Sequence, residues 1–264
     1  MGGVRMKVFA KQKMDGFAIV TGGSRGLGAN FAWRLASEGY DVVINYTSES
    51  SLEKAEALRD DIEKTFGTRA VVLRADTSDY GQCQTLVEQA VEILGDKIAV
   101  LINNAGIQTG GEFHQLDPAV YRKIISVNLL GVLYMTRAVV PYMIKHQQGV
   151  IINNASAAGY AASFKNEAYG TAKAGMLGLT RALALEMAKY NVRVNALAPT
   201  QHWTDMVANF AKREPDNFEK SCSLIPLKRC GEPEELSEAM SFLLNDTYMT
   251  GHCIAHSGGK LLLC

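Results

Sequence analysis

The 264-residue sequence has few cysteines and histidines, and their spacing fits neither a metal site nor a disulfide framework. The five cysteines are scattered and odd in number, and no CxxC pair is present. The five histidines are dispersed, without an HExxH motif. We therefore expect no metal centre, reduced thiols and a cytoplasmic location.

The chain also lacks an excess of charge of either sign. Lys plus Arg and Asp plus Glu balance at 27 each, so no overall field attracts nucleic acid or an anionic membrane. The basic N-terminal stretch has no apolar run of signal-peptide length, and no other run is expected to span a bilayer. We expect no nucleic-acid or membrane partner, and we interpret residues 1–14 as a flexible leader.

Short apolar runs alternate with segments of helical periodicity. One helix is expected to begin at a capping box of Ser50 and Glu53 and to end at Gly67, and another to begin at Asp117–Pro118. This alternation predicts βαβ units, and hence one α/β domain over residues 15–264 with a doubly wound parallel sheet and helices on both faces. About seven strands are expected, at 17–21, 41–45, 70–74, 99–103, 150–154, 193–196 and 253–256.

A glycine-rich turn, TGGSRGLG, follows the first expected strand and precedes an amphipathic helix. Such a turn lets the backbone approach a phosphate and directs free N–H groups and the helix dipole at it. The spacing is not GxGxxG, and no lysine follows as in a phosphate loop. A tight packing turn is the alternative, but the position favours a dinucleotide site that includes Gly22, Ser24, Arg25, Gly26, Leu27 and Gly28.

The end of the second expected strand indicates which dinucleotide is bound. An acidic residue there would bind the ribose hydroxyls of NAD, but this chain has Asn45, Tyr46, Thr47 and Ser48. The guanidinium of Arg25, near hydroxyl groups and without a competing carboxylate, suits a 2′-phosphate. We therefore predict NADP(H) rather than NAD(H), with Tyr46 and Thr47 in the site. A solvated loop charge is the alternative for Arg25.

Three residues of a second motif follow the fifth expected strand: Ser156, Tyr169 and Lys173. Tyr169 and Lys173 are four residues apart, so they share one face of a helix. A lone pair of this kind is usually a surface pair. We expect the lysine ammonium to lower the pKa of Tyr169 from its ordinary value of about 10. Tyrosine then becomes a usable general acid and base near neutral pH.

The ordered set of motifs resembles the short-chain dehydrogenase/reductase family from about Gly16 to Gly259. The set comprises TGGSRGLG, RADTSD, NNAG, VNLLG, NNASAAG, YGTAK and VNALAPT. The resemblance implies a Rossmann-like domain and hydride transfer between a nicotinamide and a ketone or secondary alcohol. Within the family, the chain is most similar to the 3-oxoacyl-acyl-carrier-protein reductase group.

The resemblance also implies roles for single residues. Ser156 would hydrogen-bond the substrate oxygen, Tyr169 would protonate it, and Lys173 would hold the nicotinamide ribose. Asn128 would anchor a water that relays protons to Lys173. Because all four positions are filled, a non-catalytic dinucleotide-binding regulator is the remote alternative. Further cofactor contacts are implied for Asp76, Thr77, Asn104, Ala105, Gly106, Pro199 and Thr200.

Other interpretations remain open at some of these positions. Asp76 can instead cap a helix at Asp76–Asp79, and Asn103 and Asn104 suit structural or cofactor-adjacent roles. Two positions depart from the family pattern. Thr200 stands where relatives usually have glycine, which affects the nicotinamide pocket, and Ser257 stands where many have aspartate, which affects C-terminal packing.

Two loops are expected to line a substrate pocket at the ends of the strands. The loop after the serine offers Tyr160 and Phe164, and a lid at about 200–226 offers Trp203 and Met206. A helix face docked on the core is the alternative for the lid residues. Relatives in the 3-oxoacyl reductase group dock an acidic carrier through basic residues, but here the basic patch is thin: Lys145, His146, Arg181 and Lys189.

The predicted substrate is a 3-oxoacyl thioester. A hydroxysteroid or bile-acid dehydrogenase, or a dehydrogenase of another small alcohol, is the alternative. Relatives are most often homotetramers built by two long helices and the C-terminal segments. The helices expected at 117–146 and 166–190 and the apolar ending GGKLLLC therefore predict a homotetramer or homodimer.

Overall fold

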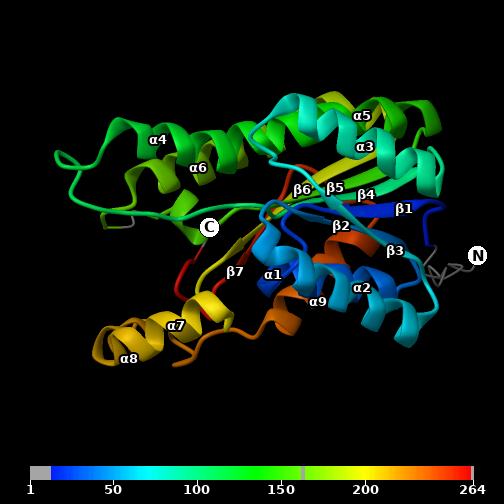
Figure 1. The fold of residues 1–264 in the computed structure, drawn as a ribbon. Coiled ribbons are helices and arrows are strands. Elements are labelled where there is room, and N and C mark those ends of the chain that lie inside the picture. Colours follow the sequence, from blue (N-terminus) through cyan, green and yellow to red (C-terminus); the bar gives the residue numbers. More distant parts are fainter. Residues whose placement is uncertain (1–12, 162–163, 263–264) are drawn as a thin grey trace, which may run out of the picture.

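The computed structural model describes residues 13–161 and 164–262 and contains one seven-stranded parallel sheet (Figure 1). The strand order is β3-β2-β1-β4-β5-β6-β7, so the direction of winding reverses between β1 and β4. In open α/β sheets, ligands bind at this reversal, outside the carboxyl ends of the strands. The strands are β1 Phe17–Val20, β2 Asp41–Tyr46, β3 Ala70–Arg74, β4 Ile98–Asn103, β5 Gly149–Asn154, β6 Val192–Pro199 and β7 Cys253–His256.

Helices cover both faces of the sheet, which confirms the predicted doubly wound fold. Helices α1, α2 and α9 lie on one face, and α3, α4, α5 and α6 lie on the other (Figure 1). The helices are α1 Gly26–Ser37, α2 Leu52–Phe66, α3 Tyr80–Leu94, α4 Pro118–Ile125, α5 Gly131–His146, α6 Glu167–Met187, α7 Asp205–Arg213, α8 Pro215–Ser223 and α9 Pro233–Asn245. Helices α7 and α8 project away from the sheet and fall within the expected lid.

The alternation of side chains along each strand gives the sheet two cores. In β2, Val42 and Ile44 pack with α1, α2 and α9, whereas Val43 packs with α3 and α5 on the opposite face. Burying one large aliphatic side chain stabilises the fold by about 1.5–3 kcal/mol, so these two layers hold the strand ends rigidly.

The observed boundaries correct two details of the prediction. Strand β6 runs to Pro199, beyond the expected end at residue 196. The expected capping box of Ser50 and Glu53 is wrong. A 3₁₀ turn at Glu49–Ser51 precedes α2, and the N-cap Ser51 makes no side-chain capping bond. Ser50 lies inside this 3₁₀ turn, so it is not the N-cap residue that a capping box requires.

The segment from Pro118 to His146 forms one continuous helix of 29 residues, in which π-helical Ser126–Leu130 joins α4 to α5. Its most apolar part has a mean hydropathy of 1.6, so length and composition alone would allow it to cross a membrane. The expectation that no run spans a bilayer is not contradicted by this test of length and composition alone. Met135, Val139 and Met143 of this helix are fully buried in the core, which accounts for its apolar composition.

Candidate active site

The predicted cofactor and catalytic segments meet at the carboxyl ends of four neighbouring strands. The glycine turn follows β1, the segment Asn104–Gly106 follows β4, Ser156 follows β5, and Thr200 follows β6. Because all the strands are parallel, their carboxyl ends lie along the same edge of the sheet. Residues that are far apart in the sequence are thereby brought to one site.

Two positions of the glycine turn, Gly22 and Gly28, favour glycine over any residue with a side chain. Gly22 has φ +59°, a left-handed conformation that favours glycine. A Cβ atom on Gly28 would lie 2.1 Å from the carbonyl oxygen of Gly22. The turn is also attached to the buried Asn45 at the end of β2: Gly22 N–H donates to its Oδ1 at 3.1 Å, and Gly23 N–H to its carbonyl oxygen at 2.8 Å.

Asn104 fixes the other side of the glycine turn. Its amide nitrogen donates to the carbonyl oxygens of Thr21 and Gly22 at 3.0 and 3.1 Å. Its Oδ1 accepts from Nδ2 of Asn154, at the end of β5, at 2.9 Å. The Thr21 hydroxyl in turn accepts from the N–H groups of Asn104 and Ala105 at 2.9 and 3.0 Å. Side-chain amides therefore connect the ends of β1, β4 and β5.

Arg25 belongs to the glycine turn, which is hydrogen-bonded to Asn45 near the end of β2 through Gly22 and Gly23. Its side chain is exposed, and it makes no ion pair with any residue that the structure describes. Tyr46 is the last residue of β2 and Thr47 follows it; the Thr47 hydroxyl donates to the carbonyl oxygen of Ala75 at 3.2 Å. The role of Arg25 toward a 2′-phosphate stays a prediction.

Asp76 is not the cap of α3. The N-cap is Asp79, whose carboxylate accepts from Gln82 N–H at 3.0 Å. Asp76 instead accepts from the N–H and the hydroxyl of Ser78 at 2.9 and 2.7 Å. The helix-cap alternative for Asp76 is therefore wrong.

The Ser156 and Tyr169 side chains lie near each other, and Ser156 affects the pKa of the tyrosine. Ser156 follows β5 and caps a 3₁₀ turn, with its hydroxyl accepting from Ala158 N–H at 3.1 Å. Tyr169 lies in the first turn of α6, and Gly159 of the serine turn packs directly against the backbone of Lys173. Burial raises the pKa of the Tyr169 phenol above its ordinary value, and the nearby Ser156 side chain opposes that rise.

Lys173 is enclosed on the same face of α6. Its ammonium nitrogen lies 5.6 Å from the centre of the Tyr169 ring and donates to the carbonyl oxygen of Asn154 at 2.7 Å. Burial lowers its pKa to about 7, because the protein interior disfavours the charged form. The expectation that Lys173 lowers the pKa of Tyr169 is therefore wrong for the protein alone, where burial dominates both groups.

Asn128 lies in the π-helical stretch between α4 and α5 and is fully buried. Its amide nitrogen donates to the carbonyl oxygens of Ile107 and Ile124 at 2.8 and 2.9 Å. Its Oδ1 accepts from Ile107 N–H at 3.3 Å and leaves no room for a side chain on Gly106. Asn128 thus holds the segment after β4, and π-helical irregularities of this kind are frequent at functional sites.

Among the described side chains, the rings of Tyr160, Phe164 and Trp203 make no contact with one another. Trp203 packs at its edge on Phe218 of α8, with ring centres 5.6 Å apart, and is 44% exposed. Phe164 is 85% exposed and Tyr160 is 39% exposed. Tyr160 lines a shallow cavity beside the first turns of α6. The side chain of Met206 lies outside the described part of the structure.

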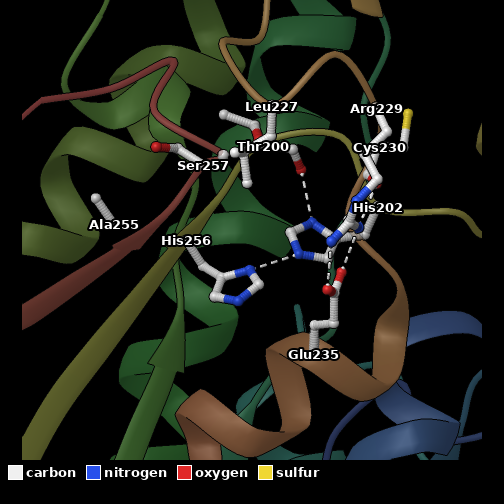
Figure 2. A pocket seen from close by; sticks show the side chains of 11 residues that line it. Thr200, His202, Leu227, Arg229, Cys230, Glu235, Ala255, His256 and Ser257 are labelled. Atoms are coloured by element: carbon white, nitrogen blue, oxygen red, sulfur yellow. Dashed lines mark hydrogen bonds and ion pairs between the residues drawn. The ribbon is translucent and has the colours of Figure 1, made fainter.

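Two histidines that the sequence analysis treats as dispersed lie in contact. Nε2 of His202 is 2.8 Å from Nδ1 of His256, and Nδ1 of His202 is 3.1 Å from the carbonyl oxygen of Thr200 (Figure 2). A carbonyl only accepts, so His202 donates from Nδ1 and accepts from His256. Burial lowers the pKa of both imidazoles. They line a cavity of about 230 Å³ with Leu227, Arg229, Cys230 and Glu235.

The contact between His202 and His256 follows from the register in which β6 pairs with β7. His256 ends β7 opposite Pro199, three residues before His202. Contact between the two imidazoles therefore depends on the pairing of β6 with β7 and on the turn after Pro199, which residue spacing along the chain does not reveal.

The family model described as "short chain dehydrogenase" matches residues 16–215. A 3-oxoacyl-acyl-carrier-protein reductase of Staphylococcus aureus is 34% identical over 255 residues, which cover 95% of this chain and 100% of the relative. The enzyme of the same name from Synechocystis is 35% identical over 248 residues, covering 93% of this chain and 96% of that enzyme.

Solved structures agree with these matches. Levodione reductase has a TM-score of 0.87 and 31% identity, covering 94% of this chain and 98% of that chain. A variant of actinorhodin polyketide ketoreductase with NADPH has a TM-score of 0.86 and 28% identity, covering 93% and 97%. The chain therefore belongs to the short-chain dehydrogenase family and is an oxidoreductase that acts on alcohols or ketones.

Proposed function

We propose that the protein is an NADPH-dependent ketoreductase whose substrate is a 3-oxoacyl thioester. The observation that carries the proposal is the placement of Ser156, after β5, near Tyr169 of α6, with the ammonium nitrogen of Lys173 5.6 Å from the centre of the Tyr169 ring. This arrangement lies beside a glycine turn at the reversal point of the sheet. A proton donor and a dinucleotide site are therefore neighbours.

The residues of the glycine turn fit a dinucleotide. A Cβ atom on Gly28 has no space, and the turn opens directly into α1, so backbone N–H groups and the positive end of the helix dipole face the site. Gly22, Ser24, Gly26 and Leu27 would hold the pyrophosphate. Asp76 and Thr77 would contact the adenine, and Ala105, Gly106, Pro199 and Thr200 would border the rest of the cofactor.

Arg25 supports NADP(H) over NAD(H). Its guanidinium is exposed and makes no ion pair with a described residue, and the positions from Asn45 to Ser48 at the end of β2 hold no carboxylate to bind the ribose hydroxyls. A 2′-phosphate placed between Arg25 and the hydroxyls of Tyr46 and Thr47 would receive charge-assisted hydrogen bonds. The polyketide ketoreductase of similar structure was solved with NADPH.

The residues of the site divide the proton chemistry among them. When bound, the nicotinamide supplies hydride to the carbonyl carbon. Tyr169 donates its proton to the carbonyl oxygen, and its raised pKa keeps that proton in place until the oxygen becomes negative. Ser156 hydrogen-bonds the same oxygen and stabilises its developing charge. Lys173 holds the ribose and returns a proton to Tyr169, a role that suits a pKa of about 7.

The thioester substrate rests on the curated relatives, which are named as 3-oxoacyl-acyl-carrier-protein reductases. The basic surface that would dock a carrier is weak: Lys145 lies 2.6 Å from Asp96, which neutralises it. A free apolar ketone, such as a steroid or bile acid, is favoured instead by the exposed rings of Phe164 and Trp203.

The predicted homotetramer or homodimer gains support from exposed apolar side chains. Leu133 of α5 and Leu185 of α6 are exposed on the two helices expected to pair, and Phe242 and Tyr248 are exposed near the C-terminal strand. Apolar side chains in these places suit contact with another copy of the chain.

Replacing Tyr169 with phenylalanine should abolish turnover and leave NADPH binding intact. The phenylalanine ring fills the same space but has no proton to donate, so the loss should be at least about 100-fold in kcat. Steady-state kinetics give kcat, and quenching of protein fluorescence gives the Kd for NADPH. Tyr248→Phe, at a fully exposed position, is the control. Near wild-type turnover by Tyr169→Phe would remove the acid assignment.

Replacing Arg25 with alanine should raise the KM for NADPH far more than the KM for NADH. Only NADPH carries the phosphate that the guanidinium would bind, and the loss of such a charged contact is worth about 1.5–3 kcal/mol. Both KM values are measured with one ketone substrate. Arg59→Ala, on the exposed face of α2, should change neither. Equal changes in the two KM values would exclude the 2′-phosphate role.

Burial of Lys173 should make stability rise with pH in the protein without cofactor. Between pH 7 and 10.5 the folded lysine is neutral and the unfolded one is protonated, so unfolding takes up a proton. The free energy of unfolding should therefore rise by up to about 1.4 kcal/mol per pH unit in this range. Urea denaturation of the wild type and of Lys173→Met tests this. The variant should lack this rise, and identical slopes would contradict the burial argument.

A substrate panel distinguishes the two candidate functions. NADPH oxidation is followed with an acetoacetyl thioester, keto-steroids, keto-bile acids and a simple diketone, and each assay is repeated with NADH. We expect rapid turnover of the thioester. Turnover of a steroid ketone without the thioester would replace the proposal with a hydroxysteroid dehydrogenase.

A further inference from the structure

Two cysteines lie in contact at the base of the expected lid. Cys222 is near the end of α8, and Cys230 lies in the segment before α9; their sulfur atoms are 3.6 Å apart. Cys222 is partly exposed and Cys230 is buried at the edge of the cavity that contains His202 (Figure 2). Cys83 and Cys253 do not share this arrangement: the Cys83 thiol donates to the carbonyl oxygen of Thr77.

A disulfide between these sulfur atoms needs only a small movement. Disulfide sulfur atoms are about 2.05 Å apart, so each must approach the other by less than the radius of an atom. The residues between them, 224–229, form turns and no helix or strand, and such a segment adjusts without breaking regular structure.

We propose that Cys222 and Cys230 are a modification site, a dithiol that hydrogen peroxide oxidises to a disulfide and that a thiol reductant restores. The partly exposed Cys222 sulfur attacks a peroxide oxygen, the O–O bond breaks, and the leaving hydroxide takes up a proton to become water. The product is a sulfenic acid on Cys222. The Cys230 sulfur then loses its proton and attacks the Cys222 sulfur, so that the S–S bond forms and the S–O bond breaks, releasing a second water. The two sulfur atoms supply the two electrons that reduce the peroxide.

The order of the two attacks follows from the surroundings of the thiols. Burial raises the pKa of Cys230 to about 12, because the interior disfavours its thiolate. Cys222 therefore meets the oxidant first, and Cys230 resolves the sulfenic acid beside it. Cytosolic disulfides are usually transient, and one that closes a short exposed segment is of the reducible kind.

The disulfide would tie α8 to the segment after β6. Gly231, next to Cys230, accepts from Trp203 N–H at 2.8 Å and donates to the carbonyl oxygen of Gln201 at 3.0 Å. Before oxidation, α8 is joined to that segment through the Ser221 hydroxyl, which donates to Gln201 Oε1 at 2.7 Å. Oxidation adds a covalent link beside this hydrogen bond and limits the movement of α7 and α8.

Peptide mapping of the full chain tests the site. The protein is treated with hydrogen peroxide, alkylated and digested with trypsin, which cuts after Lys220, Lys228, Arg229 and Lys260. We expect peptides 221–228 and 230–260 to remain joined, with a mass two hydrogen atoms below the sum of the reduced peptides. Dithiothreitol should separate them.

Peptide 230–260 contains Cys253 as well as Cys230, so single variants are needed to identify which cysteine forms the disulfide. Cys253→Ser should retain the link and Cys222→Ser should abolish it. A link through Cys83, Cys253 or Cys264, or only sulfinic acid on Cys222, would overturn the proposal.

Hydrogen exchange tests the tether separately. Amides of residues 205–223 should exchange several-fold more slowly after oxidation of the wild type, and dithiothreitol should restore the original rates. Peroxide should leave these rates unchanged in Cys222→Ser. Equal exchange rates in the reduced and the disulfide-bonded wild type would contradict the proposal that the disulfide limits the movement of α7 and α8. Neither readout depends on the substrate or the cofactor.

Discussion

The arrangement of the site depends on one hydrogen-bonded path through side-chain amides. Asn154 donates to Asn104, and Asn104 donates to two carbonyl oxygens of the glycine turn, while the backbone oxygen of Asn154 accepts from Lys173. The turn that would hold the phosphates and the lysine of the catalytic set are therefore positioned by the same two residues. A shift of β5 relative to β1 would disturb both functions at once, and the buried layers on the two faces of the sheet oppose such a shift.

Burial determines the protonation states of Lys173 and Tyr169. A lysine enclosed by α6 and the end of β5 loses most of its preference for the ammonium form, and a buried tyrosine keeps its proton. Under the proposed function, the protein alone would be set for proton donation, as reduction of a ketone requires. A cationic nicotinamide beside the phenol would favour the phenolate, so the state of the bound cofactor, more than Lys173, would move the site between its acid and base forms.

Local patterns predicted much of this structure. The apolar strand runs, the Asp117–Pro118 helix start and the glycine turn each depend on neighbouring residues, and each appears at or close to its predicted position, although β6 extends further than expected. The capping box failed because a 3₁₀ turn competes for the same residues. The pKa of Tyr169 was mispredicted because a helical spacing shows that two groups share a face but not how deeply that face is buried.

Contacts made across the sheet explain what the sequence could not reveal. Asn45 occupies the position expected to face the ribose, yet it is fully buried and holds the glycine turn to β2 and to the end of β3. His202 and His256 are 54 residues apart, and only the pairing of β6 with β7 brings their imidazoles together. Cys222 and Cys230 are closer in sequence, but their contact requires the turns after α8 to fold back along the C-terminal segment, where Leu227 N–H donates to Gly258. The segment from Thr200 to Trp203 thus contacts His256, α8 and the loop before α9. A change in the position of any of these three would therefore affect Thr200, the residue expected beside the nicotinamide.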